Sequence, residues 1–99
     1  MPKYILTNRA VKDLSDIWNY TFDNWSERQA GKYYKILLEA CREISERPNV
    51  GKKYNGVING LLGYKTGHHI IFYNIEDNKD VLIIRILHEQ MDLRNRMKE

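Results

Sequence analysis

The three histidines of the chain, His68, His69 and His88, are the side chains whose type and spacing could support chemistry. They lie at the outer ends of two apolar stretches, "HHIIFYNI" and "VLIIRIL", which the polar segment "EDNKD" separates. Because imidazole titrates near neutral pH, two histidines held side by side could act as general acid and general base, as in RNA cleavage. The same pair could provide the first ligands of a metal site.

The two apolar stretches are rich in β-branched residues and predict an antiparallel hairpin. A two-residue turn at Asn78-Lys79 would place Asp77 opposite Asp80, and like charges directly across a hairpin cost stability. A longer loop formed by "EDNKD", with Ile75 opposite Val81, avoids that pair. We therefore predict the longer loop.

This register places His68 opposite His88 and Ile71 opposite Arg85, although a slip by one residue would change which histidines meet. A metal site is not favoured, because no carboxylate stands at a ligand-like spacing to complete it. The simpler interpretation is that polar residues end apolar strands where the sheet meets water. We adopt that interpretation and predict no catalytic residue, no metal and no cofactor.

A helical hairpin precedes these strands. "KYILT" (residues 3–7) reads as a short strand, and Thr7 or Asn8 can cap the helix that follows. Ser26 and Gln29 have the spacing of a capping box, so a second amphipathic helix begins there. It ends before Pro48, because the residue before a proline is forced away from helical geometry.

The remaining segments are a loop, a strand and a short helix. Glycines punctuate the polar stretch Asn49–Gly63, which predicts a loop, and "LLGYKT" predicts a strand after it. Met91–Lys98 predicts a short C-terminal helix. The fold class is therefore α+β: an N-terminal strand, a two-helix hairpin packed on a small antiparallel sheet, and a C-terminal helix in one domain, 1–99.

Both faces of the predicted hairpin of strands are largely apolar, which is unusual for antiparallel strands unless both faces are covered. One face carries Ile70, Phe72, Leu82, Ile84 and Ile86. The other carries His69, Ile71, Tyr73, Ile75, Val81, Ile83, Arg85 and Leu87. The two helices can cover only one face, and eight C-terminal residues are too few to cover the other. We therefore predict that the second face is partly bare and binds a partner protein.

Arg85 is the one charge within "LIIRIL", and a buried arginine is unfavourable unless it is paired or reaches water. We expect Arg85 to point out of the bare face or to pair with a carboxylate such as Glu89 or Asp92. Lys65 and Arg94 would extend the same basic surface.

The composition indicates which cellular compartment and which partners to expect. The 99 residues carry a net charge of +3, which permits an acidic or nucleic-acid partner but requires neither. Cys41 is the only cysteine, which favours a reducing compartment, and its place on an apolar helical stripe predicts burial. Without an apolar run of signal-peptide or membrane-span length, the protein is expected to be cytoplasmic and not bound to a membrane.

The order of these elements resembles the RelE/ParE toxin superfamily, and within it the ParE branch. The resemblance rests on "LTNRAVKDLSDIWNYT", "WSERQAGKYY", "RPNVGKKY", "GLLGYKTGHHIIFY" and "IIRILHEQMDL", which together span nearly the whole chain. It implies a bacterial type II toxin that poisons DNA gyrase and forms a hetero-oligomer with a neutralising ParD-like antitoxin. It implies no sequence-specific DNA binding by this chain alone.

The alternative that the resemblance leaves open is a RelE-like endoribonuclease that cleaves mRNA, with Lys65, Arg85 and the histidines in its site. Against it, "IIFY" lacks the arginine expected of such relatives, and "LHEQMDLRNRM" has no tyrosine. We therefore predict a non-enzymatic toxin. Its expected partner-binding residues are Lys65, His69, Ile71, Tyr73, Ile83, Arg85, Leu87, Met91 and Arg94.

Overall fold

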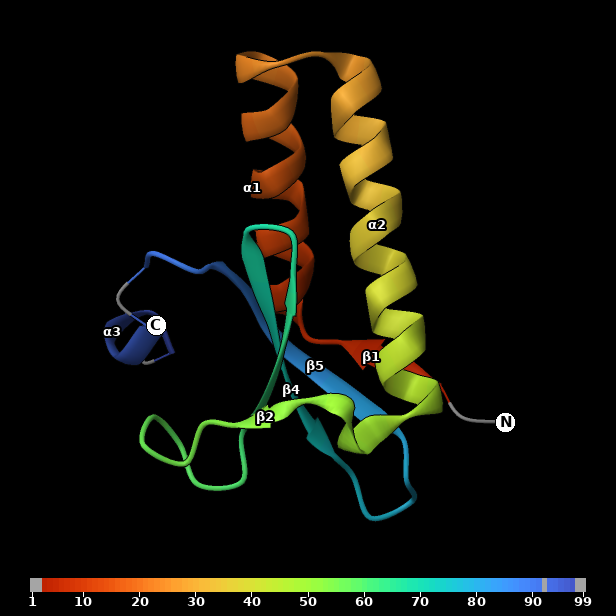
Figure 1. The fold of residues 1–99 in the computed structure, drawn as a ribbon, viewed down its shortest axis with the longest axis vertical. Helices are drawn as coiled ribbons and strands as arrows, with labels where there is room; N and C mark the ends of the chain where they lie inside the picture. The colour runs from red at the N-terminus through yellow and green to blue at the C-terminus, as the bar shows by residue number, and fades with distance from the viewer. Residues whose placement is uncertain (1–2, 92, 98–99) are drawn as a thin grey trace.

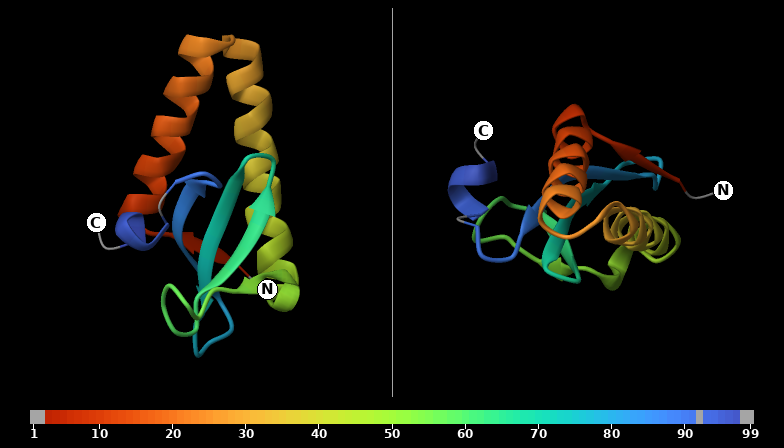
Figure 2. Two further views of the ribbon diagram at one scale, coloured as in Figure 1. Left: turned by 60° about the vertical axis from the view of Figure 1, so that its left-hand side comes forward. Right: turned by 90° about the horizontal axis from the view of Figure 1, so that it is seen from above.

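The computed structural model of the chain describes residues 3–91 and 93–97. Helices α1 (Asn8–Asn24) and α2 (Glu27–Glu46) form a hairpin that packs against a five-stranded sheet. The closed end of the hairpin rises beyond the sheet, whereas its open end lies against the strands (Figure 1). Figure 2 shows the same arrangement from two further directions, with the short helix α3 (Leu93–Met97) near the open end of α1.

The sheet has the strand order β1-β5-β4-β3-β2. Its members are β1 (Tyr4–Leu6), β2 (Lys52–Lys53), β3 (Leu62–Thr66), β4 (His69–Ile75) and β5 (Val81–His88). The predicted α+β class is confirmed, but the sheet is mixed, because β1 pairs with β5 in parallel while the other pairs are antiparallel. Strand β2 lies within the predicted loop Asn49–Gly63, and the 3-10 turn η1 (Pro48–Val50) overlaps its start.

Side-chain caps fix where the two long helices begin. The Thr7 hydroxyl accepts a hydrogen bond from the backbone N–H of Ala10 at 3.1 Å, and the Ser26 hydroxyl accepts one from that of Gln29 at 3.0 Å. Each cap satisfies a donor that has no partner within its helix. Helix α2 ends at Glu46, before Pro48, as predicted.

A β-bulge divides the β4–β5 hairpin. Ile75 pairs with Val81 as predicted, but the register shifts between Tyr73 and Phe72, so that His69 rather than His68 lies opposite His88. The shift leaves one extra residue, Ile84, on β5, as a bulge does.

The N-terminal segment holds the bulge in place. Thr7 donates its backbone N–H to the carbonyl of Ile83 and its hydroxyl to the carbonyl of Ile84, at 3.0 and 2.8 Å. Beyond β1, an Asp13 carboxylate oxygen accepts the backbone N–H of Ile86 at 3.0 Å. Groups of α1 and of its cap residue Thr7 thus replace the missing neighbouring strand along the end of β5.

The core has two parts, one on each face of the sheet. Under the helices, Leu14, Leu37, Cys41 and Ile44 pack with Ile71, Tyr73, Val81, Ile83 and Ile86. On the other face, Ile70, Phe72 and Leu87 pack with Leu61, Tyr54 and Val57 of the loop and with Leu93 and Met97 of α3. Cys41 is fully buried as predicted, and burial raises the pKa of its thiol to about 12.

The prediction of a bare apolar face is wrong. Ile71, Tyr73 and Ile83 have no exposed surface, because they form the face that the helices cover. The opposite face is covered in turn by loop residues together with α3, and Leu87 is 2% exposed there. The error lay in treating Asn49–Gly63 as a loop that could cover nothing.

Candidate functional site

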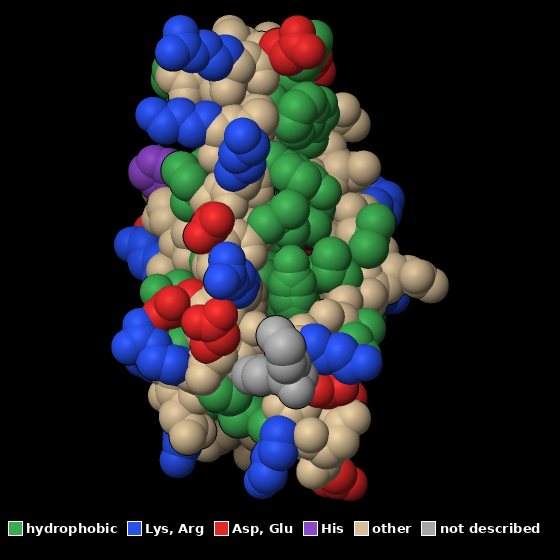
Figure 3. Space-filling view, turned by 90° about the vertical axis from the view of Figure 1, so that its right-hand side faces the viewer, with side chains coloured by type: hydrophobic (Ala, Val, Ile, Leu, Met, Phe, Trp, Pro, Cys, Tyr) green, Lys and Arg blue, Asp and Glu red, His purple; other side chains and the backbone are tan. Residues whose placement is uncertain are grey.

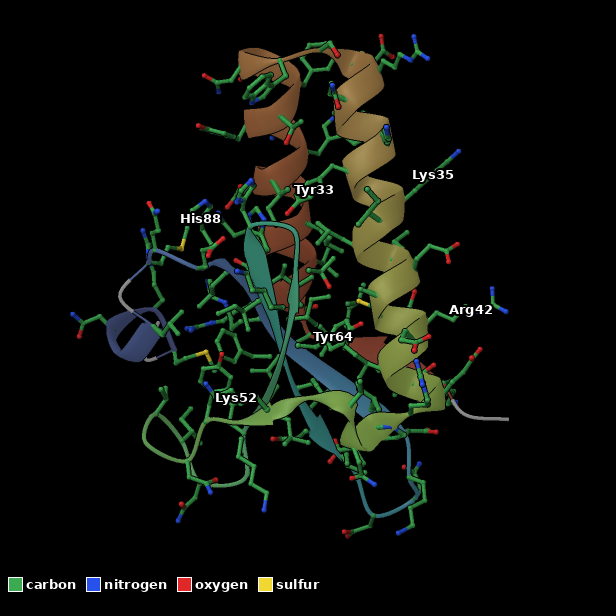
Figure 4. The ribbon with its side chains drawn as sticks, viewed as in Figure 1. Tyr33, Lys35, Arg42, Lys52, Tyr64 and His88 are labelled. Carbon is green, nitrogen blue, oxygen red and sulfur yellow. The ribbon has the colours of Figure 1, made fainter. Side chains whose placement is uncertain are left out.

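The three histidines meet at one end of the sheet, where β4 begins and β5 ends. The His69 and His88 rings lie edge to face with centroids 5.3 Å apart, and the His68 ring stacks on His88 at 6.2 Å. The bulge that moves His69 opposite His88 makes this three-membered cluster. Figure 4 shows His88 beside the hairpin, on the side where α1 and the end of β5 approach each other.

Tyr33 of α2 fixes the position of His69. Its hydroxyl oxygen lies 2.6 Å from Nδ1 of His69 and accepts the backbone N–H of His68 at 3.2 Å. The adjoining turn has glycine at position 67, with φ of 60°, and any Cβ there would lie 2.8 Å from the Tyr33 hydroxyl. Sequence reasoning did not find Tyr33, because its spacing on α2 is that of an ordinary core residue.

Burial keeps His69 neutral. Loss of solvent, with smaller contributions from His88 and His68, lowers the pKa of His69 from 6.5 to about 4. The Tyr33 hydroxyl lies between Nδ1 of His69, at 2.6 Å, and the carbonyl of Thr66, at 3.4 Å, and which group donates to which depends on the tautomer of His69. In His88, Nδ1 accepts the backbone N–H of Gln90 at 3.1 Å, which leaves Nε2 as the nitrogen that carries the hydrogen. His88 therefore keeps an Nε2–H donor.

Glu89 links the histidine cluster to β3. Its carboxylate oxygens lie 3.2 Å from Nζ of Lys65 and 3.3 Å from Nδ1 of His68. The hydrogen bond from Lys65, followed by that from His68, lowers the pKa of Glu89. Lys65 thus lies beside the cluster, as part of an exposed ion pair.

An open groove of about 970 Å³ runs alongside the cluster. One wall is α1, which contributes Arg9, Lys12, Asp13, Asp16, Ile17 and Tyr20. The other wall is the end of β5 with the segments around it, which contribute His69, Arg85, Leu87, His88, Met91 and Arg96. We call this feature the α1–β5 groove.

A buried ion pair forms the base of the groove. Arg85 is 7% exposed and donates from Nε and Nη2 to the two Asp13 carboxylate oxygens at 2.8 and 2.9 Å. Its Nη1 donates to the backbone carbonyl of Arg96 in α3 at 2.7 Å. Arg85 therefore joins α1, β5 and α3. Arg85 neither points out of the sheet into solvent nor pairs with Glu89, so these two expectations are wrong. The third, a pairing with Asp92, lies outside the described residues.

The structure gathers only part of the predicted partner-binding set. His69, Arg85, Leu87 and Met91 line the α1–β5 groove, and Met91 is 38% exposed. Lys65 lies next to the groove through Glu89. The remaining apolar members, Ile71, Tyr73 and Ile83, belong to the core. The side chain of Arg94 lies outside the described part of the chain.

A second surface, which sequence reasoning did not single out, lies on the other side of α1. Apolar side chains follow the junction of α1, α2 and β1, and Figure 3 shows hydrophobic side chains gathered there in a column along the long axis. Val11 is 50% exposed, Phe22 47% and Trp25 73%. We call this surface the apolar stripe. Leu6, Val11, Trp18 and Tyr34 line it, and Phe22 and Trp25 follow Trp18 by four and seven residues, which places them on the same side of α1. Trp18 and Tyr34 meet edge to face at 5.8 Å.

Two negative findings concern the described residues alone. No set of three or more His, Cys, Asp or Glu side chains among residues 3–91 and 93–97 is placed to hold a metal ion. Within the same ranges, neither long helix has an apolar run that could cross a membrane.

Solved structures with the same fold come from toxin–antitoxin systems. The chromosomal ParDE system of P. aeruginosa contains a chain that matches with a TM-score of 0.77, at 18% sequence identity, over 89% of this chain and 96% of that one. The RelBE2 complex of Mycobacterium tuberculosis contains another, with a TM-score of 0.69, at 22% identity, over 90% of this chain and all of that one. The fold is therefore that of the RelE/ParE-like toxins.

Sequence comparison gives the family within that fold. The model of the family described as "ParE toxin of type II toxin-antitoxin system, parDE" matches residues 4–93. Toxin ParE1 of Caulobacter vibrioides is 35% identical over 94 residues, which cover 95% of this chain and 96% of that protein. Toxin ParE1 of Mycobacterium tuberculosis is 29% identical and covers 92% and 93%. The chain belongs to the ParE family of toxins of type II toxin–antitoxin systems.

Proposed function

We propose that this ParE-family toxin inhibits DNA gyrase, and thereby replication, and that a ParD-like antitoxin holds it inactive in a hetero-oligomer. Family membership supports the toxin role. The observation that carries the antitoxin partner is the apolar stripe, because a monomer rarely leaves so continuous an apolar surface in water unless a partner covers it.

The shape of the apolar stripe favours a helical occupant. It follows the seam between two helices, and the side chains of Val11, Trp18 and Phe22 repeat at helical spacing along α1. An amphipathic helix buries its own apolar side chains in a groove of this kind. The antitoxin is therefore expected to place a helix along α1 and α2.

A binding mechanism, rather than catalysis, is the other part of the proposal. His69 has a pKa of about 4, so it is a weak general base at neutral pH. Arg85 is held by Asp13 and by the carbonyl of Arg96, and serves to join three elements. We therefore assign inhibition to contacts with gyrase.

A plasmid supercoiling assay with purified gyrase tests this function. The toxin alone is expected to inhibit supercoiling, and prior mixing with the product of the adjacent antitoxin gene is expected to restore it. The result that would contradict the proposal is unimpaired supercoiling at toxin concentrations that arrest growth in cells.

RNA cleavage is a second candidate, which one observation favours. His69 and His88 lie within 5.3 Å, between ring centroids, on the wall of an open groove that also carries Arg9, Lys12 and Arg96. Such a groove could hold a phosphodiester between two imidazoles. An RNA cleavage assay, run with and without ribosomes, separates the two functions, since His88→Gln should then reduce cleavage by about 100-fold or more.

A further inference from the structure

We propose that the α1–β5 groove docks an acidic segment of the toxin's target protein, in which carboxylates are flanked by apolar side chains. This inference rests on the proposed function, since it concerns how the toxin holds its target. It gives the two surfaces described above different partners: the apolar stripe binds the antitoxin, and the groove binds the target.

Hydrogen-bond donors dominate the polar groups of the groove. The Nδ1 atoms of His69 and His88 are occupied by the Tyr33 hydroxyl and by the backbone N–H of Gln90, so only Nε2 of each ring is left to contact a ligand, and Nε2 of His88 carries a hydrogen. Arg9, Lys12 and Arg96 carry donors and no side-chain acceptor. A ligand that supplies oxygen acceptors matches this set of groups.

The charge balance favours a negative ligand. Among the described lining residues, four cations (Arg9, Lys12, Arg85 and Arg96) face two carboxylates, so a positive excess remains. Both carboxylates are already engaged within the protein. Asp13 accepts from Arg85 and from the N–H of Ile86, and Asp16 pairs with Lys12 at 2.9 Å. The pairs Arg85–Asp13 and Lys12–Asp16 cancel, so the net positive charge that an incoming carboxylate would meet comes from Arg9 and Arg96.

The apolar part of the groove favours a protein segment over nucleic acid. Ile17 lines it, and Tyr20 and Met91 are 66% and 38% exposed on its two walls. A phosphate backbone has no apolar group to place against these side chains. A peptide with alternating acidic and apolar residues can satisfy both the cations and the apolar surface, and aromatic anchors such as Tyr20 often supply much of the affinity.

The groove and the apolar stripe lie on opposite faces of α1. The groove residue Tyr20 lies about two and a half helical turns after the stripe residue Val11, and the stripe residue Trp18 lies equally far after the groove residue Arg9. A half turn places the two members of each pair on opposite sides of the helix. In Figure 1 the end of β5 and α3 lie on one side of α1, while α2 lies on the other. A helix seated on the stripe therefore leaves the groove open, and this separation assigns the groove to the target rather than the antitoxin.

Two groove variants and two matched controls test the proposal. Arg9→Glu reverses a charge in the first turn of α1, where an acidic side chain suits the helix dipole and the fold is retained. Tyr20→Ala removes an exposed aromatic side chain. The controls are Lys35→Glu and Ile36→Ala on α2, which make equivalent changes at exposed positions that do not line the groove; Figure 4 shows Lys35 pointing outward from α2.

Each protein is compared for thermal stability, for affinity toward the purified antitoxin and for inhibition of gyrase. We expect both groove variants to need about tenfold more toxin for half-inhibition, which corresponds to the loss of one good interface contact. Their antitoxin affinity and melting temperature should stay at the wild-type values. Both controls should match the wild type in gyrase inhibition and in melting temperature.

The other outcomes each have a definite meaning. If the groove variants weaken antitoxin binding and leave gyrase inhibition unchanged, the groove belongs to the antitoxin and the proposal is overturned. It is also overturned if the variants change neither antitoxin binding nor inhibition. DNA binding by the toxin without gyrase, lost in Arg9→Glu and at high salt, would show a phosphate ligand and overturn it too.

If the wild-type toxin arrests growth without inhibiting gyrase, the gyrase function fails alone. The groove is then judged by whether its variants relieve growth arrest while the controls do not; a wild type that arrests no growth overturns both.

Discussion

Arg85 shows what a single residue's surroundings in the sequence can and cannot predict. Its place within "LIIRIL" correctly indicated that the charge needs a partner. The partner could not be found from the sequence, because Asp13 lies 72 positions away and meets Arg85 only when α1 crosses the end of β5. Local candidates such as Glu89 were favoured by proximity alone, whereas Glu89 pairs with Lys65 and His68.

Removing Arg85 should strongly destabilise the fold. In Arg85→Ala the buried Asp13 carboxylate keeps the N–H of Ile86 but loses both guanidinium hydrogen bonds. Breaking a buried pair costs about 3–5 kcal/mol of the free energy of unfolding. Urea denaturation measures this loss, with Lys12→Ala, which breaks the exposed pair with Asp16, as a control that should change little. A loss for Arg85→Ala below about 1 kcal/mol would contradict the assigned role.

His69 should make the stability of the protein depend on pH. The unfolded chain binds a proton at this residue near pH 6.5, whereas the folded protein resists protonation until about pH 4. The stabilising contribution of His69 is therefore complete above pH 6.5 and is lost as the pH falls toward 4. The shift in pKa sets an upper bound of about 3 kcal/mol on this loss of the free energy of unfolding. The actual loss is smaller, because the ring is partly solvated.

The variant His69→Gln isolates this contribution. Urea unfolding of both proteins at pH 7, 6 and 5 gives the difference in the free energy of unfolding at each pH. Since carboxylates titrate in both proteins, only that difference reports on His69. We expect the variant to lose less stability than the wild type as the pH falls, and equal slopes would rule the contribution out.

At the scale of elements, the local signals predicted well and the long-range ones did not. The two long helices follow from apolar spacing and from caps at Thr7 and Ser26, all of which are encoded within a few residues. The β4–β5 loop followed from avoiding the pair Asp77–Asp80. The bulge could not be predicted, because it is held by Thr7, from a distant segment. A one-residue shift moves side chains to the other face, so this single feature changed which histidines meet.

Strand β2 is an element that depends on a core tyrosine. Its two lysines carry no alternating pattern, and the segment before it is held by Tyr73, whose hydroxyl accepts the N–H of Gly51 at 2.9 Å and donates to the carbonyl of Pro48 at 2.7 Å. Any side chain at Gly51 would collide with that hydroxyl.

Tyr73→Phe should therefore loosen this segment without harming the helices. The substitution leaves two backbone groups without their partner, which costs about 1–3 kcal/mol of the free energy of unfolding. Amide hydrogen exchange at Gly51 should also become faster. Tyr64→Phe on β3 is the control, since the Tyr64 hydroxyl makes no hydrogen bond to the residues that the structure describes; equal effects of the two substitutions would contradict the role of Tyr73.

At the scale of the whole molecule, an exposed apolar surface exists, but on the helices rather than on the sheet. The sequence argument counted layers and found one face of the sheet uncovered, because it gave no covering role to Tyr54, Val57 and Leu61 in the loop. The outer side of the helix hairpin escaped attention because the sequence argument treated the two helices only as cover for one face of the sheet. Both tryptophans of the chain, Trp18 and Trp25, lie on that side.

The position of the two tryptophans allows the antitoxin surface to be tested directly. Toxin labelled with 5-fluorotryptophan should give two fluorine resonances, and both should shift when unlabelled antitoxin binds, because its helix would cover the apolar stripe. The melting temperature should rise with antitoxin concentration, since a ligand that binds only the folded form stabilises it by mass action. Trp18→Phe and Trp25→Phe assign the resonances. A rise in melting temperature without movement of either resonance would place the antitoxin elsewhere and leave the apolar stripe without its proposed partner.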